Sequence, residues 1–204
     1  MASRCPGVYH CPMSSLSRRE FLAATGGSLA GVWLLAEARD LLAAGAHAAR
    51  AARESPPPPF QILTADQAAD VEALAAQIIP RDGTPGAREA RVVYFIDHSL
   101  ATFGKDQRPM FEKGLKDLRS RAAKTHRGAK SFAALGDAEQ VAVLTAMEKD
   151  KSEFFEAMRG ATITGMLAHP DYGGNYQKIG WKMIGFDDQF SWAAPFGWYD
   201  RDAR

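Results

Sequence analysis

Apolar side chains recur at intervals of three and four residues through most of the chain from Phe60 to Pro170. This spacing gathers them on one face of an α-helix, and it predicts five helices. The first follows Thr64 and ends at Pro80, the second begins near Arg88, and the third runs from about Arg108 to Thr125. The fourth opens at Asp137, and the fifth carries its apolar positions between Phe154 and Met166 and ends near His169. No stretch alternates with a period of two for long enough to indicate a strand. The pattern predicts an all-α fold, a small bundle of about five helices.

Polar residues mark the starts of two of these helices. Thr64 and Gln67 have the spacing of a capping box, in which each side chain bonds the backbone amide of the other residue. Asp137 and Gln140 repeat that spacing, which predicts the same cap at the fourth helix. Between the first two helices, residues 80–87 read PRDGTPGA, and two prolines with two glycines predict a shaped loop.

The second helix carries the pair of residues best suited to general acid–base chemistry, Asp97 and His98. The apolar positions predict a buried face that holds Val92, Phe95, Ile96, Ser99, Leu100 and Phe103. Adjacent residues on a helix point to different faces. The pair is therefore predicted to lie on the surface and to have no catalytic role.

Composition and charge narrow the class of protein. With 46% hydrophobic and 24% charged residues, the chain has the balance of a soluble globular protein. Its 25 basic and 24 acidic residues leave a formal charge of +1, so no overall field attracts nucleic acid, and we expect no nucleic-acid partner. The only cysteines are Cys5 and Cys11, near the N-terminus. A domain without them has no thiolate nucleophile, iron–sulfur cluster or haem attachment.

The motifs of the common cofactor and catalytic sites are missing from the sequence. It contains no Gly-x-Gly-x-x-Gly turn, no phosphate-binding loop and no Gly-x-Ser-x-Gly elbow. His98, His126 and His169 are isolated, whereas metal sites need clustered ligands. We expect no catalytic, cofactor-binding or metal-binding residue in this chain.

The N-terminal region has the features of an export signal. Arg18 and Arg19 stand directly before Glu20, Phe21 and Leu22, and a glycine-diluted apolar stretch follows at 23–36. This resembles a twin-arginine signal and implies passage through the twin-arginine translocon to the periplasm. The stretch is shorter than the about 20 residues of a transmembrane helix. An uncleaved anchor helix is the alternative.

Two sites fit the small-x-small pattern of signal cleavage, Ala36-Glu37-Ala38 and Ala46-His47-Ala48, and the sequence does not choose between them. The chain is then predicted to divide into a signal region (1–48), a linker rich in Ala, Arg and Pro (49–59), a helical domain (60–187) and a tail (188–204). Residues 171–204 are rich in glycines and aromatic residues, among them Trp181, Trp192 and Trp198. Such a segment must pack on something, either its own helices or another protein.

Three parts of the sequence together resemble the gluconate 2-dehydrogenase subunit 3 family. They are the SRREFL leader, residues 63–97 and residues 169–186, where the chain reads HPDYGGNYQKIGWKMIGF. The resemblance implies a small helical accessory subunit, free of cofactor, of a membrane-associated sugar or sugar-acid dehydrogenase. Its partners would be a flavoprotein large subunit of the glucose-methanol-choline (GMC) type, which holds the FAD, and a cytochrome c subunit. The small subunit would supply the export signal for the large one.

The resemblance offers no catalytic residues, but it directs attention to the loops of the two shared blocks. We expect these loops to meet the large subunit, with the tail docking beside them. The residues in question are Asp82, Pro85, Tyr172, Gly173, Gly174, Asn175, Trp181, Lys182, Trp192 and Trp198. A purely structural role for the prolines and glycines is the alternative. A second hypothesis for function is a stand-alone periplasmic enzyme or binding protein, in which Asp82, Asp97 and Asp171 form a carboxylate site only in the fold.

Overall fold

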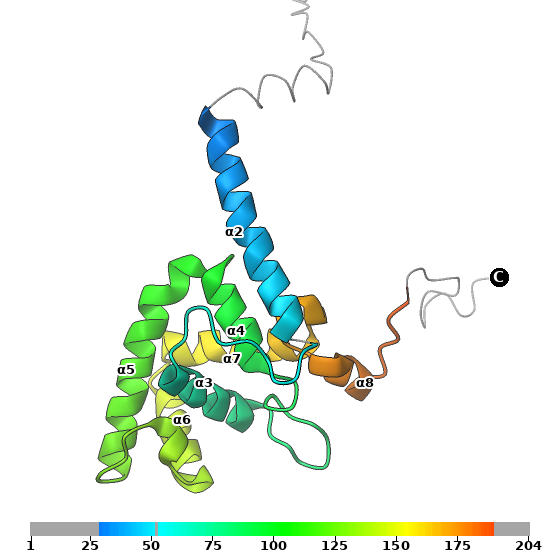
Figure 1. Ribbon diagram of the computed structural model, residues 1–204. Helices are drawn as coiled ribbons and strands as arrows, with labels where there is room; N and C mark the ends of the chain where they lie inside the picture. Colours follow the sequence, from blue (N-terminus) through cyan, green and yellow to red (C-terminus); the bar gives the residue numbers. More distant parts are fainter. Residues whose placement is uncertain (1–28, 52, 190–204) are drawn as a thin grey trace, which may run out of the picture. The chain divides into compact units, whose positions relative to one another are not determined.

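The computed structural model describes residues 29–51 and 53–189 of the chain. These residues contain seven α-helices and no strand, which confirms the all-α fold (Figure 1). The helices are α2 (Leu29–Ala51), α3 (Ala65–Ile78), α4 (Val92–Ala101), α5 (Arg108–Thr125), α6 (Asp137–Lys149), α7 (Glu153–Leu167) and α8 (Ile179–Met183), with short 3-10 turns η1 (Lys105–Gln107), η2 (Phe132–Ala134), η3 (Pro170–Tyr172) and η4 (Tyr176–Lys178). Helices α3 to α7 are the five that the sequence predicts.

The chain divides into two units, Met1–Leu41 and Leu42–Arg204. Helix α2 crosses the division, and its last turns belong to the second unit. There Ala44, Ala48 and Ala51 are buried, at the spacing of four and three residues that keeps side chains on one face of a helix. Within the described residues, no helix combines the length and the apolar character needed to cross a membrane.

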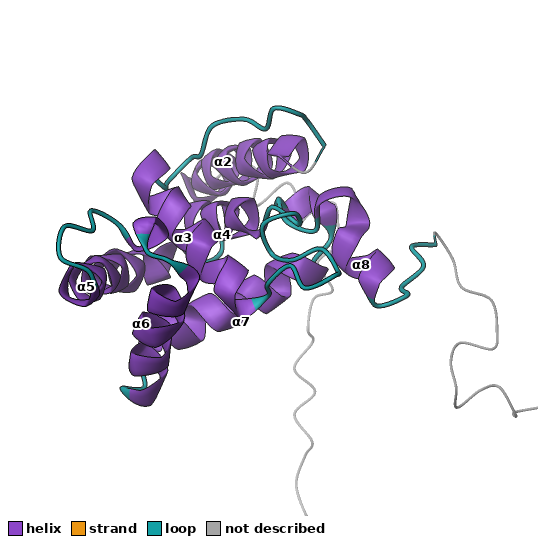
Figure 2. Ribbon diagram, turned by 90° about the horizontal axis from the view of Figure 1, so that it is seen from below, coloured by secondary structure: helices purple, strands orange, loops and turns teal. Residues whose placement is uncertain are grey.

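Helix α4 is the central helix of the second unit. Eight of its ten residues are buried, including Val93, Tyr94 and Asp97. Helices α3 and α7 pack against it (Figure 2), and so does η3. A helix covered on several sides has no surface face, so the prediction that Asp97 and His98 form a surface pair is wrong. Phe103 follows the helix end at Ala101 and is 61% exposed, so its predicted burial is wrong as well.

The remaining helices pack through aromatic side chains and a partly buried ion pair. The Phe111 ring of α5 meets the Phe154 ring of α7 edge to face, with centroids 5.5 Å apart. The Asp70 carboxylate of α3, fully buried, pairs with Arg119 of α5 at 2.6 Å and accepts the Ala133 amide of η2 at 3.0 Å. These contacts join α3, α5, α7 and η2 into one core.

The two predicted caps have different outcomes. Thr64 and Gln67 form the predicted capping box at α3, with both side chain to backbone bonds present. The cap predicted at α6 is wrong by one residue: the Glu139 carboxylate accepts the Gly136 amide, and Asp137 is the first residue of the helix. Gln140 is buried instead, where its side-chain amide donates to the carbonyls of Phe132 and Leu135.

Candidate functional site

Most of the second shared block, residues 169–181, packs tightly on α4 and α7, and we call this part the 169–181 segment. Gly173 has a φ of 102°, a conformation that favours glycine, and it lies against the Tyr94 carbonyl of α4. A Cβ atom at Gly174 would clash with the Gly165 carbonyl, and one at Gly180 would clash with the Met166 carbonyl, both on α7. The glycines are therefore required for the backbone of this segment to approach the two helices.

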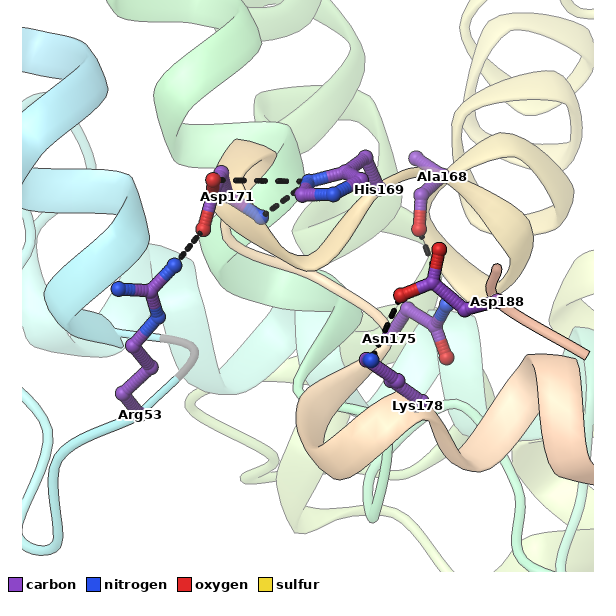
Figure 3. A network of polar contacts seen from close by, with 7 residues as sticks. All are labelled: Arg53, Ala168, His169, Asp171, Asn175, Lys178 and Asp188. Atoms are coloured by element: carbon purple, nitrogen blue, oxygen red, sulfur yellow. Dashed lines mark hydrogen bonds and ion pairs between the residues drawn. The ribbon is translucent and has the colours of Figure 1, made fainter. Parts of the chain in front are cut away.

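Asn175 holds the segment together from inside. Its side chain is fully buried, and its Nδ2 donates to the Ala168 carbonyl at the end of α7 at 3.0 Å (Figure 3). Its Oδ1 accepts the Gly180 amide at 2.8 Å. Because both halves of the side-chain amide are paired, this buried polar group stabilises the fold and specifies one path for the chain.

Trp181 also packs on its own domain. It is 9% exposed, and its indole Nε1 donates to the Leu167 carbonyl at 2.7 Å. The rings of His169 and Phe186 meet it edge to face, with centroids 5.6 and 5.1 Å away. Most of the indole surface is therefore buried against this chain itself. The α8 residues that follow Trp181, Lys182 and Met183, are exposed.

Arg91 links the two shared blocks and the end of α2. Its guanidinium donates to the carbonyls of Ala51 at 2.9 Å and Glu54 at 2.6 Å, and it lies 3.6 Å from the centroid of the Tyr176 ring. The Tyr176 amide in turn donates to the Ala90 carbonyl at 3.0 Å. An arginine over an aromatic ring, also bonded to helix-end carbonyls, is a favourable arrangement. The sequence pattern alone assigns no role to Arg91, although this residue lies inside the first shared block.

Ion pairs line the outer edge of the 169–181 segment, as Figure 3 shows. Asp171 pairs with Arg53, just beyond α2, and its amide donates to the His169 ring. Lys178 pairs with Asp188 at 2.6 Å. All of these side chains are at least a third exposed, and such pairs stabilise a fold by less than about 1 kcal/mol each. Their main effect is to give this edge of the domain a defined pattern of charge.

The first shared block contains the loop of residues 80–87, of which residues 80–85 are exposed and Gly86 and Ala87 are buried. Asp82 accepts a hydrogen bond from the Thr84 hydroxyl at 3.1 Å, and both Asp82 and Pro85 are exposed. Beside the loop lies a hollow of about 540 Å³ with a largely polar lining that includes Arg81, Arg88 and Glu89. The loop therefore offers polar surface, in contrast to the apolar surface around α8.

The structure divides the predicted interface residues into two groups. Asp82, Pro85, Tyr172 and Lys182 are exposed, whereas Gly173, Gly174, Asn175 and Trp181 are buried in the domain itself. The buried group can affect a partner only by shaping the surface. The predicted signal residues Arg18, Arg19, Phe21 and Leu22, and the tail residues Trp192 and Trp198, lie outside the described residues.

The three aspartates of the second hypothesis have separate structural roles. The buried Asp97 carboxylate accepts the backbone amides of Gln61 at 2.8 Å and of Ile62 and Leu63 at 2.9 Å each. Asp171 pairs with Arg53, and Asp82 accepts a hydrogen bond from Thr84 in its own loop. Among the described residues, no group of three or more His, Cys, Asp or Glu side chains is placed to hold a metal ion. None of these observations favours a shared carboxylate site.

His98 is a buried histidine beside Asp97. It is 4% exposed, and its Nδ1 has no hydrogen-bond partner among the described residues. Burial lowers the pKa of His98 below its ordinary value of 6.5. The Asp97 charge and a hydrogen bond with the Ala44 carbonyl act against this change, whereas the nearby His47 adds to it. The neutral ring is therefore the form that the folded state stabilises.

This histidine predicts a loss of stability in mild acid. The folded-state pKa of His98 lies below its unfolded-state value, which is about 6.5. The stability that the neutral ring contributes is therefore complete above about pH 6.5, and it falls as the pH drops below that value. One proton changes the free energy of unfolding by at most about 1.4 kcal/mol per pH unit. Urea unfolding between pH 5 and 7.5 should show this slope, and His98→Gln should reduce it. A wild-type slope in the His98→Gln variant would contradict the assignment.

The helical core and the glycine-rich segment packed on it define a small all-helical domain. Comparison with protein families agrees: the family model described as gluconate 2-dehydrogenase subunit 3 matches residues 65–188, more than half of the chain. The chain belongs to the gluconate 2-dehydrogenase subunit 3 family, as the sequence resemblance predicts, and so to the subunits of a dehydrogenase complex. The searches of curated proteins and of solved structures gave no match.

Proposed function

We propose that this chain is the non-catalytic small subunit of a periplasmic, FAD-dependent sugar or sugar-acid dehydrogenase. It binds a GMC-type flavoprotein large subunit, which holds the FAD, and it supports the folding and twin-arginine export of that subunit. A cytochrome c subunit is a further partner. The observation that carries the proposal is the family match over the helical domain, together with the Arg18-Arg19 leader upstream of it.

The route of export explains why a small subunit would be needed. The twin-arginine translocon carries proteins that are already folded, so a flavoprotein can take up its FAD in the cytoplasm before export. The small subunit carries the signal in its own N-terminal region. A large subunit bound to it can then cross without a signal of its own.

Replacing both signal arginines should stop export of the pair. In a strain that makes both subunits, Arg18→Lys with Arg19→Lys should leave the flavoprotein in the cytoplasm, because the translocon recognises the arginine pair and not its charge alone. The measurement is the fraction of flavoprotein, and of its bound FAD, in the periplasm. We expect a loss of nearly all of it.

The matched control is the double variant Arg39→Lys and Arg50→Lys, which changes two exposed arginines in the same conservative way. Export of the flavoprotein should be unchanged in this variant. If the signal variant also exports the flavoprotein normally, the escort function is wrong.

An apolar surface around Trp181 is the part of the domain best suited to bind the large subunit. Leu167, Met183, Ile184 and Phe186 are 37–57% exposed, and we call them the α7–α8 surface. They are neighbours, because Trp181 bonds the Leu167 carbonyl and its own carbonyl accepts the Phe186 amide. Exposed apolar residues that lie together, with charged Lys182 and Lys178 beside them, are typical of a protein interface.

Ile184→Asp should weaken the complex, since Ile184 is the most exposed member of the α7–α8 surface at 57%. Burying a carboxylate in an apolar interface should cost about 2 kcal/mol, or roughly a thirtyfold increase in Kd. Titration of the purified large subunit with each variant measures the effect. Val141→Asp is the matched control, because Val141 is 50% exposed on α6, outside this surface. Equal affinity of the two variants would place the interface elsewhere.

A further inference from the structure

We propose that signal peptidase cuts this chain between Ala38 and Arg39, and that the second candidate site, after Ala48, is closed by the fold. The inference rests on the proposed twin-arginine export. Both sites carry alanine at the first and third positions before the cut, Ala36 and Ala38 or Ala46 and Ala48, so the small-residue pattern fits both equally. The structure separates them.

The first reason is burial of the residues around the second site. A peptidase needs its substrate extended, with the small residue before the cut inserted in its own pocket. Ala48 is 1% exposed, and Ala44 and Ala51 on the same helical face are 6% and 0% exposed. Ala48 would have to leave the core of the second unit before the peptidase could bind it.

The second reason is the set of hydrogen bonds that hold this end of α2. The His47 ring bonds the Pro59 carbonyl at 2.7 Å and the Gln61 side chain at 3.1 Å. Arg91 bonds the Ala51 carbonyl from α4, and the Gln61 amide is bonded to Asp97. Pulling residues 46–48 into an extended form would break contacts that reach the central helix.

The order of events makes these contacts relevant to cleavage. A twin-arginine cargo crosses the membrane folded, so residues 44–51 are already packed when the peptidase meets the chain. Ala36–Ala38 belong to the first unit and precede Leu42, where the second unit begins. A cut there keeps Ala44, His47 and Ala48 in the mature domain, whereas a cut after Ala48 removes all three.

Cleavage of the purified full-length chain by purified signal peptidase in detergent tests the proposal. Intact-mass measurement should show a product that begins at Arg39. A product that begins at Ala49, or an uncut chain, would overturn the proposal. This assay needs no translocon, so it tests the cleavage site independently of export. A chain that stays in the cytoplasm of cells would contradict the proposed export but would not change the result of the cleavage assay.

A pair of variants checks the site at matched positions. Ala36→Asp and Ala46→Asp place a charge at the third residue before each candidate cut, and Ala46 is exposed, so the second variant keeps the packing of α2. Ala36→Asp should abolish the product, and Ala46→Asp should give the same product at the wild-type rate. The reverse result would assign the cut to the position after Ala48.

Discussion

Gly180→Ala is expected to destabilise the domain strongly. A Cβ atom at this position would clash with the Met166 carbonyl of α7, and it would lie 3.2 Å from the Asn175 Oδ1 that accepts the Gly180 amide. Backbone cannot move aside as a flexible side chain can, so α8 must shift away from α7 and lose the Asn175 and Trp181 hydrogen bonds. Such overpacking against backbone should cost about 3 kcal/mol or more.

Gly160→Ala is the matched control for this prediction. Gly160 lies on the exposed side of α7, and a Cβ atom there would meet no other described atom within 4 Å. Alanine is the better helix former by about 1 kcal/mol, so this variant should be as stable as the wild type or more stable. Urea unfolding followed by circular dichroism measures both. Equal stability of the two variants would mean that the 169–181 segment does not pack on α7 as described.

The elements that the sequence predicts well are the amphipathic helices. In α5, Phe111, Leu115, Leu118 and Ala122 face the core and charged residues face solvent, so the 3.6-residue period gave the correct bounds, Arg108–Thr125. The capping box of α3 depends only on Thr64 and Gln67, three residues apart. These features depend only on residues that are close in the sequence, so one sequence is enough to predict them.

Helix α4 and the 169–181 segment show where the sequence is insufficient. Nothing local in residues 92–101 says that other elements cover the Asp97 side of the helix, because those elements are distant in the sequence. The glycines of the segment are visible in the sequence, but the carbonyls of Tyr94, Gly165 and Met166 that exclude larger residues are not. The choice between an interface role and a structural role for these glycines thus required three-dimensional contacts.

The buried segment and the exposed α7–α8 surface connect stability with partner binding. Asn175 and Gly180 fix the path of the chain into α8, and that path determines where Ile184 and Phe186 lie. A change at a buried position can therefore weaken binding of the large subunit by unfolding this corner. Only variants of the exposed residues, which leave the unfolding free energy unchanged, report on the interface itself.

Asp97→Asn is expected to have the second large effect on stability. The wild-type carboxylate accepts three backbone amides, from Gln61, Ile62 and Leu63, and the side chain is 1% exposed. Asparagine keeps one oxygen but replaces the other with an NH₂ group, so a donor would face a backbone donor in a buried site. Loss of a charged acceptor and an unpaired amide should together cost about 3 kcal/mol.

The loss should extend beyond the three amides, because Gln61 also bonds His47 of α2 through its side chain. We therefore expect Asp97→Asn to expose residues 44–51 to added protease at a concentration of urea that leaves α5 protected. Asp66→Asn is the control, since Asp66 lies exposed in the first turn of α3 and should change stability by less than about 0.5 kcal/mol. If Asp97→Asn unfolds at the same urea concentration as this control, the Asp97 carboxylate does not hold residues 61–63 in place. The packing of residues 44–51 within the second unit would then need another cause.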